Sequence, residues 1–116
     1  MTLKDLKNDR EITAIVSVSE EQIEMLGYTE HSIRHVSIVA KRAGELLKKL
    51  GYDEHTVELA EIAGYLHDIG NSVSRIDHAQ SGAILSYHLL TARGMDYKDA
   101  AQIMMAIGNH DEQFGV

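Results

Sequence analysis

The sequence predicts an all-α protein that folds as a compact multi-helix bundle in one domain. Apolar residues recur at intervals of three and four along most of the chain, which is the spacing of one helix face. Proline, which breaks helix interiors, is absent from all 116 residues. The run ITAIVSV at residues 12–18 could also form a strand, but the chain offers it no partner strand. With 44% hydrophobic residues, a chain of this length can bury a single core.

The first half of the chain contains two predicted helical segments. The first is LKDLKNDREITAIVSVSEEQIEMLGY, residues 3–28, in which residues 12–26 show helical spacing. Within this segment Ser19 and Gln22 resemble a capping box, which would divide the segment into two helices with a break near Val18. A second helix is predicted over residues 29–50, with the threonine at its start as the N-cap and a glycine directly after its end.

Three further helices are predicted in the second half. The first covers residues 54–68 and carries leucine, isoleucine and alanine on its inward face. The next covers residues 77–93 and opens at Asp77, where Gln80 three residues later resembles a capping box. The last covers residues 96–108 and ends at a glycine. Repeats, low-complexity tracts and linkers are absent, which favours one bundle.

Composition excludes several classes of function. The formal net charge is −7, whereas proteins that bind a nucleic-acid backbone present a basic face, so we expect no polymeric nucleic acid as a partner. No apolar run approaches the roughly 20 residues of a membrane helix, so no membrane partner is expected. The charged N-terminus is unlike a signal peptide, and the absence of cysteine suits a cytoplasmic protein. A phosphorylated small molecule is compatible with this charge, because bound metal ions would invert the local field. Composition leaves the oligomeric state open.

Four of the seven histidines lie on, or at the ends of, apolar faces of four different predicted helices: His35, His67, His78 and His110. One histidine on an apolar face is most often a hydrogen-bonded core residue, but four in so small a bundle favour a common partner. Neutral imidazole with carboxylate, here Asp68 beside His67, is a ligand set for Mn, Fe, Co, Ni and Zn. We therefore predict a site for one or two divalent transition-metal ions.

The pair His67 and Asp68 also ends its predicted helix, just before Gly70. The carbonyl end of a helix dipole favours a cation by a few tenths to about 1 kcal/mol. The pair is therefore predicted to present two ligands into the middle of the bundle.

The remaining three histidines carry weaker signals. His31 lies one turn before His35, and this i, i+4 spacing could make it a ligand or a group that faces the substrate. His55 follows a polar turn and is interpreted as solvated. His88 is interpreted as structural.

The order and setting of these residues resemble the HD superfamily of metal-dependent phosphohydrolases. In HVSIVAKRAGELLKKLGYDEHTVELAEIAGYLHDIGN, residues 35–71, a histidine opens an amphipathic helix that ends in Leu-Gly. A second helix then ends in Leu-His-Asp-Ile-Gly, much as the family pattern does. On this alignment His35 rather than His31 takes the place of the first ligand, because Val39 and Gly51 then fall in the family register.

Two later segments extend the resemblance. HAQSGAIL at His78 and IGNHDE at His110 are similar to elements of family members that bind more than one metal. By this resemblance Asp68 is both a ligand and the catalytic residue that positions the nucleophile. The predicted metal ligands are His35, His67, Asp68, His78, His110 and Asp111. The predicted substrate contacts are His31, Asn71 and Arg75.

The chain also departs from the family pattern. Many relatives have a lysine where Asn71 follows His-Asp-Ile-Gly. The cyclic-dinucleotide branch has a second histidine where Asp111 stands, so a cyclic dinucleotide is not the expected substrate. Relatives draw a final aspartate ligand from a helix beyond this point. We therefore expect residues 1–116 to form a single HD-like domain that lacks its C-terminal helix or helices, with a metal site one ligand short.

The function that the resemblance implies is hydrolysis of a phosphate ester of a nucleotide or similar small molecule by a metal-activated water. The alternative is a regulatory module on the same fold that binds metal or ligand without turnover. A third reading is an inert bundle with coincidental histidines. Metal content separates this third reading from the first two.

Overall fold

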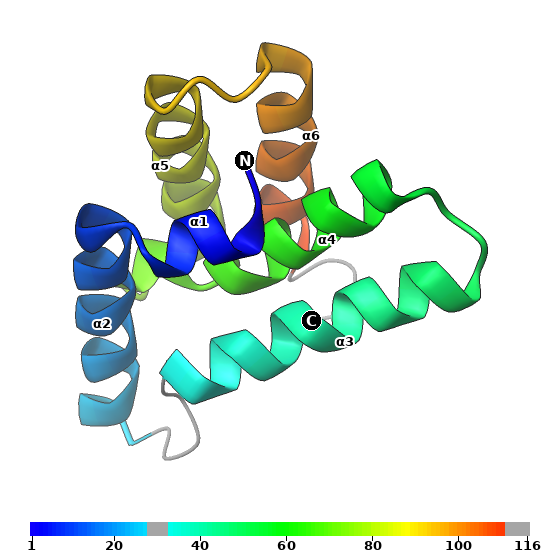
Figure 1. Ribbon diagram of the computed structural model, residues 1–116. Helices are drawn as coiled ribbons and strands as arrows, with labels where there is room; N and C mark the ends of the chain where they lie inside the picture. The colour runs from blue at the N-terminus through cyan, green and yellow to red at the C-terminus, as the bar shows by residue number, and fades with distance from the viewer. Residues whose placement is uncertain (28–32, 111–116) are drawn as a thin grey trace.

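Six α-helices and one 3-10 helix make up the regular structure of the residues described by the computed structural model, 1–27 and 33–110 (Figure 1). No strand occurs in these ranges, so the predicted all-α class is confirmed. Within the same part of the chain, no helix combines the length and the apolar character that crossing a bilayer requires. The elements are α1 (Leu3–Lys7), α2 (Arg10–Met25), α3 (Ile33–Lys49), α4 (Glu54–Leu66), η1 (Ile69–Ser72), α5 (His78–Ala92) and α6 (Tyr97–Gly108).

Short polar side chains start most of these helices by accepting hydrogen bonds from N–H groups of the first turn. Thr2 and Asp5 form a reciprocal capping box on α1, a short helix that the sequence analysis did not separate from the next one. Asp9 then caps α2 by accepting from the backbone N–H three residues later at 3.0 Å. Asp53 and Asp96 cap α4 and α6 in the same way.

The predicted break near Val18 is wrong, because α2 is continuous over Arg10–Met25. A capping serine must leave the helical conformation, whereas Ser19 lies inside α2 on its buried face and is 1% exposed. Its hydroxyl donates instead to the carbonyl oxygen of Asp68 at 2.6 Å. The spacing to Gln22 predicted that the Ser19 hydroxyl caps a helix. In the structure this hydroxyl instead joins α2 to a distant segment of the chain.

The predicted cap at Asp77 is also wrong, although α5 begins directly after it. Asp77 has a φ of 56°, in the left-handed region, and its side chain makes no capping hydrogen bond. Capping needs an extended backbone that aims the side chain at the first turn, and the turn into α5 does not provide one. α4 ends at Leu66 rather than at residue 68. The predicted cap Thr29 lies outside the described residues.

Two antiparallel helix pairs form the body of the protein (Figure 1). α3 packs along α4, α5 packs along α6, and contacts between α4 and α6 join the two pairs. η1 contacts both α2 and α5, and the short α1 contacts α2 and α4. Burying one aliphatic or aromatic core side chain contributes about 1.5–3 kcal/mol. The largest buried side chains of the shared core are those of Leu6, Ile12, Val16, Val36, Ile62, Tyr65, Leu66, Ile69, Leu90, Ile103 and Ile107.

Small residues let α3 and α4 approach closely. A Cβ atom on Gly64 would lie 3.0 Å from the Cα atom of Ala40, which is itself fully buried. The close approach brings the start of α3 toward the end of α4. As a result, the ring centres of His35 and His67 are 6.4 Å apart.

Gly70 is required by an even closer approach between η1 and the start of α5. A Cβ atom on Gly70 would lie 1.8 Å from the carbonyl oxygen of His78 and 2.6 Å from the backbone nitrogen of Gly82. Backbone atoms of a packed helix cannot rotate away as a flexible side chain can. The absence of a side chain at residue 70 therefore sets the position of α5, and with it His78, relative to Asp68.

Asp9 links the start of α2 to the end of α5. Arg93 donates from Nε to Asp9 Oδ2 at 2.6 Å and from Nη2 to Oδ1 at 3.2 Å. Arg93 also pairs with Glu11. The hydrogen bond from Arg93, followed by the bond from the backbone of Ile12, lowers the pKa of Asp9 to about 2.

Gly70→Ala is expected to lower the free energy of unfolding by about 3 kcal/mol or more, because backbone atoms of α5 would have to move. Chemical denaturation followed by circular dichroism measures this quantity. Gly108→Ala is the matched control, since a Cβ atom there would meet the Cβ of Ala83 at an ordinary 3.5 Å. Equal stability of the two variants would contradict the described contact between η1 and α5.

Asp9→Asn should lower the melting temperature at neutral pH, because it removes the ion pair with Arg93. The pKa of Asp9 is depressed from 3.8 to about 2 in the folded chain. Its stabilisation is therefore complete above the unfolded pKa and is lost as the pH falls through the folded pKa. The difference in melting temperature between wild type and variant should shrink between about pH 4 and about pH 2. A difference that stays constant across this window would rule out the ion pair as its cause.

Candidate metal centre

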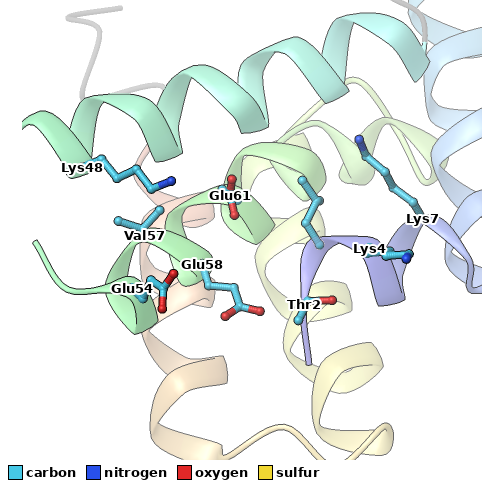
Figure 2. Close-up of a pocket in the computed structure, with 9 residues that line it drawn as sticks. Thr2, Lys4, Lys7, Lys48, Glu54, Val57, Glu58 and Glu61 are labelled. Carbon is cyan, nitrogen blue, oxygen red and sulfur yellow. The ribbon is translucent and has the colours of Figure 1, made fainter.

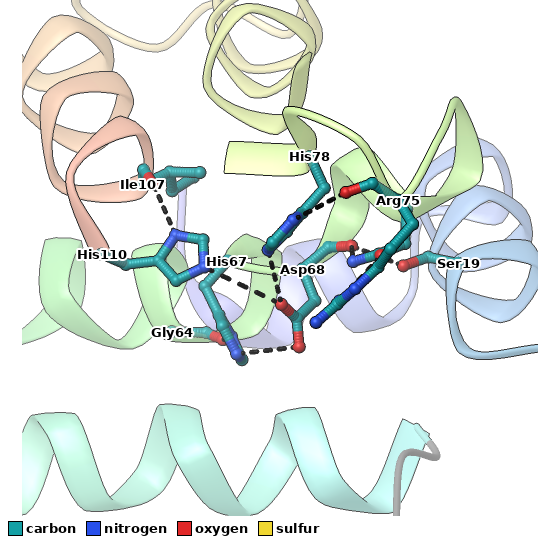
Figure 3. Close-up of polar contacts among 9 residues, drawn as sticks. Ser19, Gly64, His67, Asp68, Arg75, His78, Ile107 and His110 are labelled. Atoms are coloured by element: carbon teal, nitrogen blue, oxygen red, sulfur yellow. Dashed lines mark hydrogen bonds and ion pairs between the residues drawn. The ribbon is translucent and has the colours of Figure 1, made fainter. Parts of the chain in front are cut away.

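Four histidines and one aspartate converge on a single point inside the bundle. These side chains form two groups of three, and within each group the ligand atoms all lie within 4.8 Å of one another. Asp68 belongs to both groups. Figure 3 shows the Asp68 carboxylate facing the rings of His67, His78 and His110. The first group is His35, His67 and Asp68, and the second is Asp68, His78 and His110.

A different element positions each histidine, so the site forms only when the whole bundle is folded. His35 lies near the start of α3, and His67 is the C-cap of α4. His78 is the first residue of α5, and His110 follows the C-cap of α6. Asp68 is 6% exposed and His78 is 8% exposed, so little water reaches the centre of the site.

Three of the histidines use the same local hydrogen bond to orient their rings. The Nδ1 atoms of His67, His78 and His110 lie 2.7, 3.2 and 2.6 Å from carbonyl oxygens three residues earlier in the chain. A carbonyl oxygen only accepts, so each Nδ1 carries the hydrogen. In a neutral imidazole of this tautomer, Nε2 carries the lone pair that a metal ion would bind.

The three Nε2 atoms face the carboxylate of Asp68. Nε2 of His67 lies 3.0 Å from Oδ2, and Nε2 of His78 and of His110 lie 3.8 and 3.9 Å from Oδ1. Lone pairs on neutral nitrogens and carboxylate oxygens repel one another unless a proton or a cation lies between them. One divalent ion satisfies several of them at once, and imidazole with carboxylate is a donor set for transition metals. The residues therefore fit a metal ion.

The pKa of His67 also indicates that a positive charge is favoured at this position. Burial alone lowers the pKa of His67, but the hydrogen bond to Asp68, the charge of Asp68 and the carbonyl of Gly64 outweigh burial. The net effect is a raised pKa. Since a metal ligand must be deprotonated, a proton and a metal ion compete for this nitrogen.

Hydrogen bonds also fix the main-chain carbonyl group of Asp68. Because α4 ends at Leu66, the carbonyl of Asp68 has no partner within that helix. Ser19 Oγ donates to this oxygen at 2.6 Å, and Asn71 donates from Nδ2 at 2.8 Å and from its backbone nitrogen at 3.0 Å. Arg75 Nη1 in turn donates to Asn71 Oδ1 at 3.0 Å. These bonds orient the residue that both ligand groups share.

The structure brings together five of the six predicted metal ligands, and His35 stands where the alignment placed the first one. The predicted substrate contacts Asn71 and Arg75 lie next to Asp68. Asn71 is 2% exposed and bonded within the fold, whereas Arg75 is exposed. The other two predicted site residues, His31 and Asp111, lie outside the described residues.

Two residues of α2 beside the site, Ser19 and Glu20, were not among the predicted site residues. Glu20 is 5% exposed. Burial, and then the charge of Asp68, raises the pKa of Glu20 to about 7, whereas His67 acts in the opposite direction. A signal for Glu20 was present, because it follows the buried Val16 by one helical turn and so shares the apolar face of its helix.

The other two described histidines lie outside both ligand groups. His55 is exposed, as predicted, and its Nε2 lies 3.0 Å from Asp99 Oδ2. His88 is exposed on α5, with its ring against that of Tyr87. His55 therefore serves as a control residue in experiments on the site.

An apolar pocket of about 390 Å³ adjoins the ligands, between α3, α4 and α6. His67 and His110 supply its polar end. The rest of its described lining is apolar and includes Val39, Leu47 and Ile107. The pocket therefore offers an apolar surface directly beside two metal-ligand candidates.

A second pocket, of about 550 Å³, lies between α1, α3 and α4 (Figure 2). Its charged groups have opposite signs in equal number, so they give no preference for an anion. None of its described lining residues belongs to the histidine and aspartate groups. This larger space is therefore not the candidate for metal chemistry. Its charged lining residues are Lys4, Lys7, Lys48, Glu54, Glu58 and Glu61.

Comparison with known protein families agrees with this geometry. The HD domain family matches residues 29–113. No similar curated protein and no similar solved structure was found. The matched range covers well over half of the chain and contains both groups of converging ligands, and the protein therefore belongs to the HD domain family.

Proposed function

We propose that this protein is a metal-dependent phosphohydrolase that cleaves a phosphate ester of a nucleotide or a similar small molecule. HD domains are typically metal-dependent phosphohydrolases. The observation that carries the proposal is the set of three Nε2 atoms that face one buried carboxylate. Three imidazole nitrogens grouped around one buried carboxylate form a donor set for a divalent transition-metal ion, which supports a cation site.

The bound ion would lower the pKa of a water molecule and neutralise charge on the phosphoryl oxygens. Asp68 belongs to both ligand groups, so its carboxylate is suited to hold the two sets in a fixed relation and to orient the nucleophile. Backbone hydrogen bonds hold the rings of His67, His78 and His110 in place. Ligands oriented in advance need little rearrangement during the reaction.

The apolar pocket supports a small-molecule ester as the substrate. Its described lining contains no lysine or arginine, so the chain would contact the apolar part of the substrate there and the metal centre would take the phosphate. Its volume of about 390 Å³ lies within the roughly 300–1,000 Å³ that is usual for small-molecule pockets.

Asp68→Ala is expected to remove nearly all bound divalent metal, because Asp68 belongs to both ligand groups. His35→Ala and His110→Ala each remove a ligand of one group only, so each should weaken the binding of one ion by about 10- to 100-fold. Elemental analysis and titration with Mn²⁺ measure these changes. His55→Ala is the control and should bind metal as wild type does. Equal metal content in wild type and Asp68→Ala would exclude this site.

The wild-type chain with Mn²⁺ is expected to hydrolyse at least one member of a panel of nucleotides, phosphomonoesters and phosphodiesters. Asp68→Ala should reduce this turnover by about 100-fold or more. Ala106→Trp, which narrows the apolar pocket without removing a ligand, should raise KM for a nucleotide more than for a small aliphatic phosphate. Metal binding without turnover of any substrate would favour the alternative, a regulatory or binding module on the HD fold.

A further inference from the structure

Glu20 is a buried carboxylate close to the candidate metal centre. It lies inside α2, is 5% exposed, and shares the apolar face of that helix with Val16. Among the described residues, its Oε2 atom has no hydrogen-bond partner. Burying an unpaired carboxylate costs several kcal/mol unless a cation or a donor compensates for the lost water.

The surroundings of Glu20 identify the metal centre as the source of that compensation. The charged groups that act on Glu20 are Asp68, which repels it, and His67, which attracts it. None of the described lysines or arginines contributes. The preceding residue, Ser19, donates to the carbonyl of Asp68 at 2.6 Å, so this turn of α2 is fastened directly to the site. A second carboxylate therefore lies near the carboxylate of Asp68, where one cation would compensate for both.

We propose that Glu20 is an additional carboxylate of the metal centre, which supports a divalent ion held by His35, His67 and Asp68. Glu20 is not a member of either group of close ligand atoms, so it acts as a supporting residue beside them. With Asp68 it brings two negative charges to a site for one doubly charged ion, which makes the buried assembly neutral. Neutral burial lowers the electrostatic cost of holding the ion away from water.

Glu20→Gln tests this inference, which rests on the metal site of the proposed function. The variant keeps the size of the side chain and removes its charge, and its Kd for Mn²⁺ should rise about tenfold in a calorimetric titration. Glu24→Gln, an exposed residue one turn further along the same helix, is the matched control and should bind Mn²⁺ as wild type does.

Glu20→Met separates metal support from a structural role. This variant replaces the unpaired carboxylate with an apolar side chain, so the metal-free protein should be at least as stable as wild type. Its Kd for Mn²⁺ should nevertheless rise as in Glu20→Gln. An unchanged Kd in both variants would overturn the inference while leaving the metal site intact. A folded wild-type chain that binds no metal would overturn both the inference and the proposed function.

Discussion

The carbonyl oxygen of Asp68 is the point at which the parts of this bundle are joined. Ser19 of α2 donates to it at 2.6 Å, and Asn71 of η1 donates to it at 2.8 Å. These bonds orient the peptide that follows α4, and Gly70 then lets the chain pass close enough to α5 for His78 to face the carboxylate. Because α2 and η1 meet at this peptide and α5 meets the chain two residues later at Gly70, the same short segment fixes the packing of the core and the placement of the candidate ligands.

The histidines satisfy a requirement of the fold and a requirement of the site with the same bond. The carbonyls in the last turn of a helix lack partners within that helix. His67 bonds such a carbonyl of α4 through Nδ1, and His110 does the same for α6. The bond selects the tautomer in which Nε2 can bind a metal. A histidine directly after a helix is therefore suited to be a ligand whose orientation the backbone maintains.

The buried carboxylates of the candidate metal centre lower the stability of the metal-free chain. Asp68 and Glu20 are both buried, and their charges repel each other. Such an arrangement is unfavourable in a metal-free fold, and it persists because the rest of the bundle supplies enough stabilisation. The aliphatic core and the link between Asp9 and Arg93 contribute to that stabilisation away from the site. The same charges become favourable when a cation lies between them.

The amino-acid sequence by itself determined most of the helices and the side chains that meet at the candidate metal centre. Apolar spacing is a local property, so it indicated most of the helices, although it did not separate α1 from α2 and placed a break inside α2. Histidines on apolar faces and at helix ends, together with the His67 and Asp68 pattern, indicated which side chains would meet.

Only the tertiary structure decided what Ser19, Glu20 and Asp77 do. A serine inside a helical pattern can cap its own helix or bond another segment, and the partner of Ser19 lies 49 residues away. Glu20 is a carboxylate on an apolar face until Asp68 is brought beside it, and Asp77 resembles a cap until the turn into α5 takes a left-handed φ. The spacing of residues along the sequence indicates which groups a side chain can reach within its own helix. The packing of distant segments decides which of the competing partners it meets, because those partners are absent until the bundle forms.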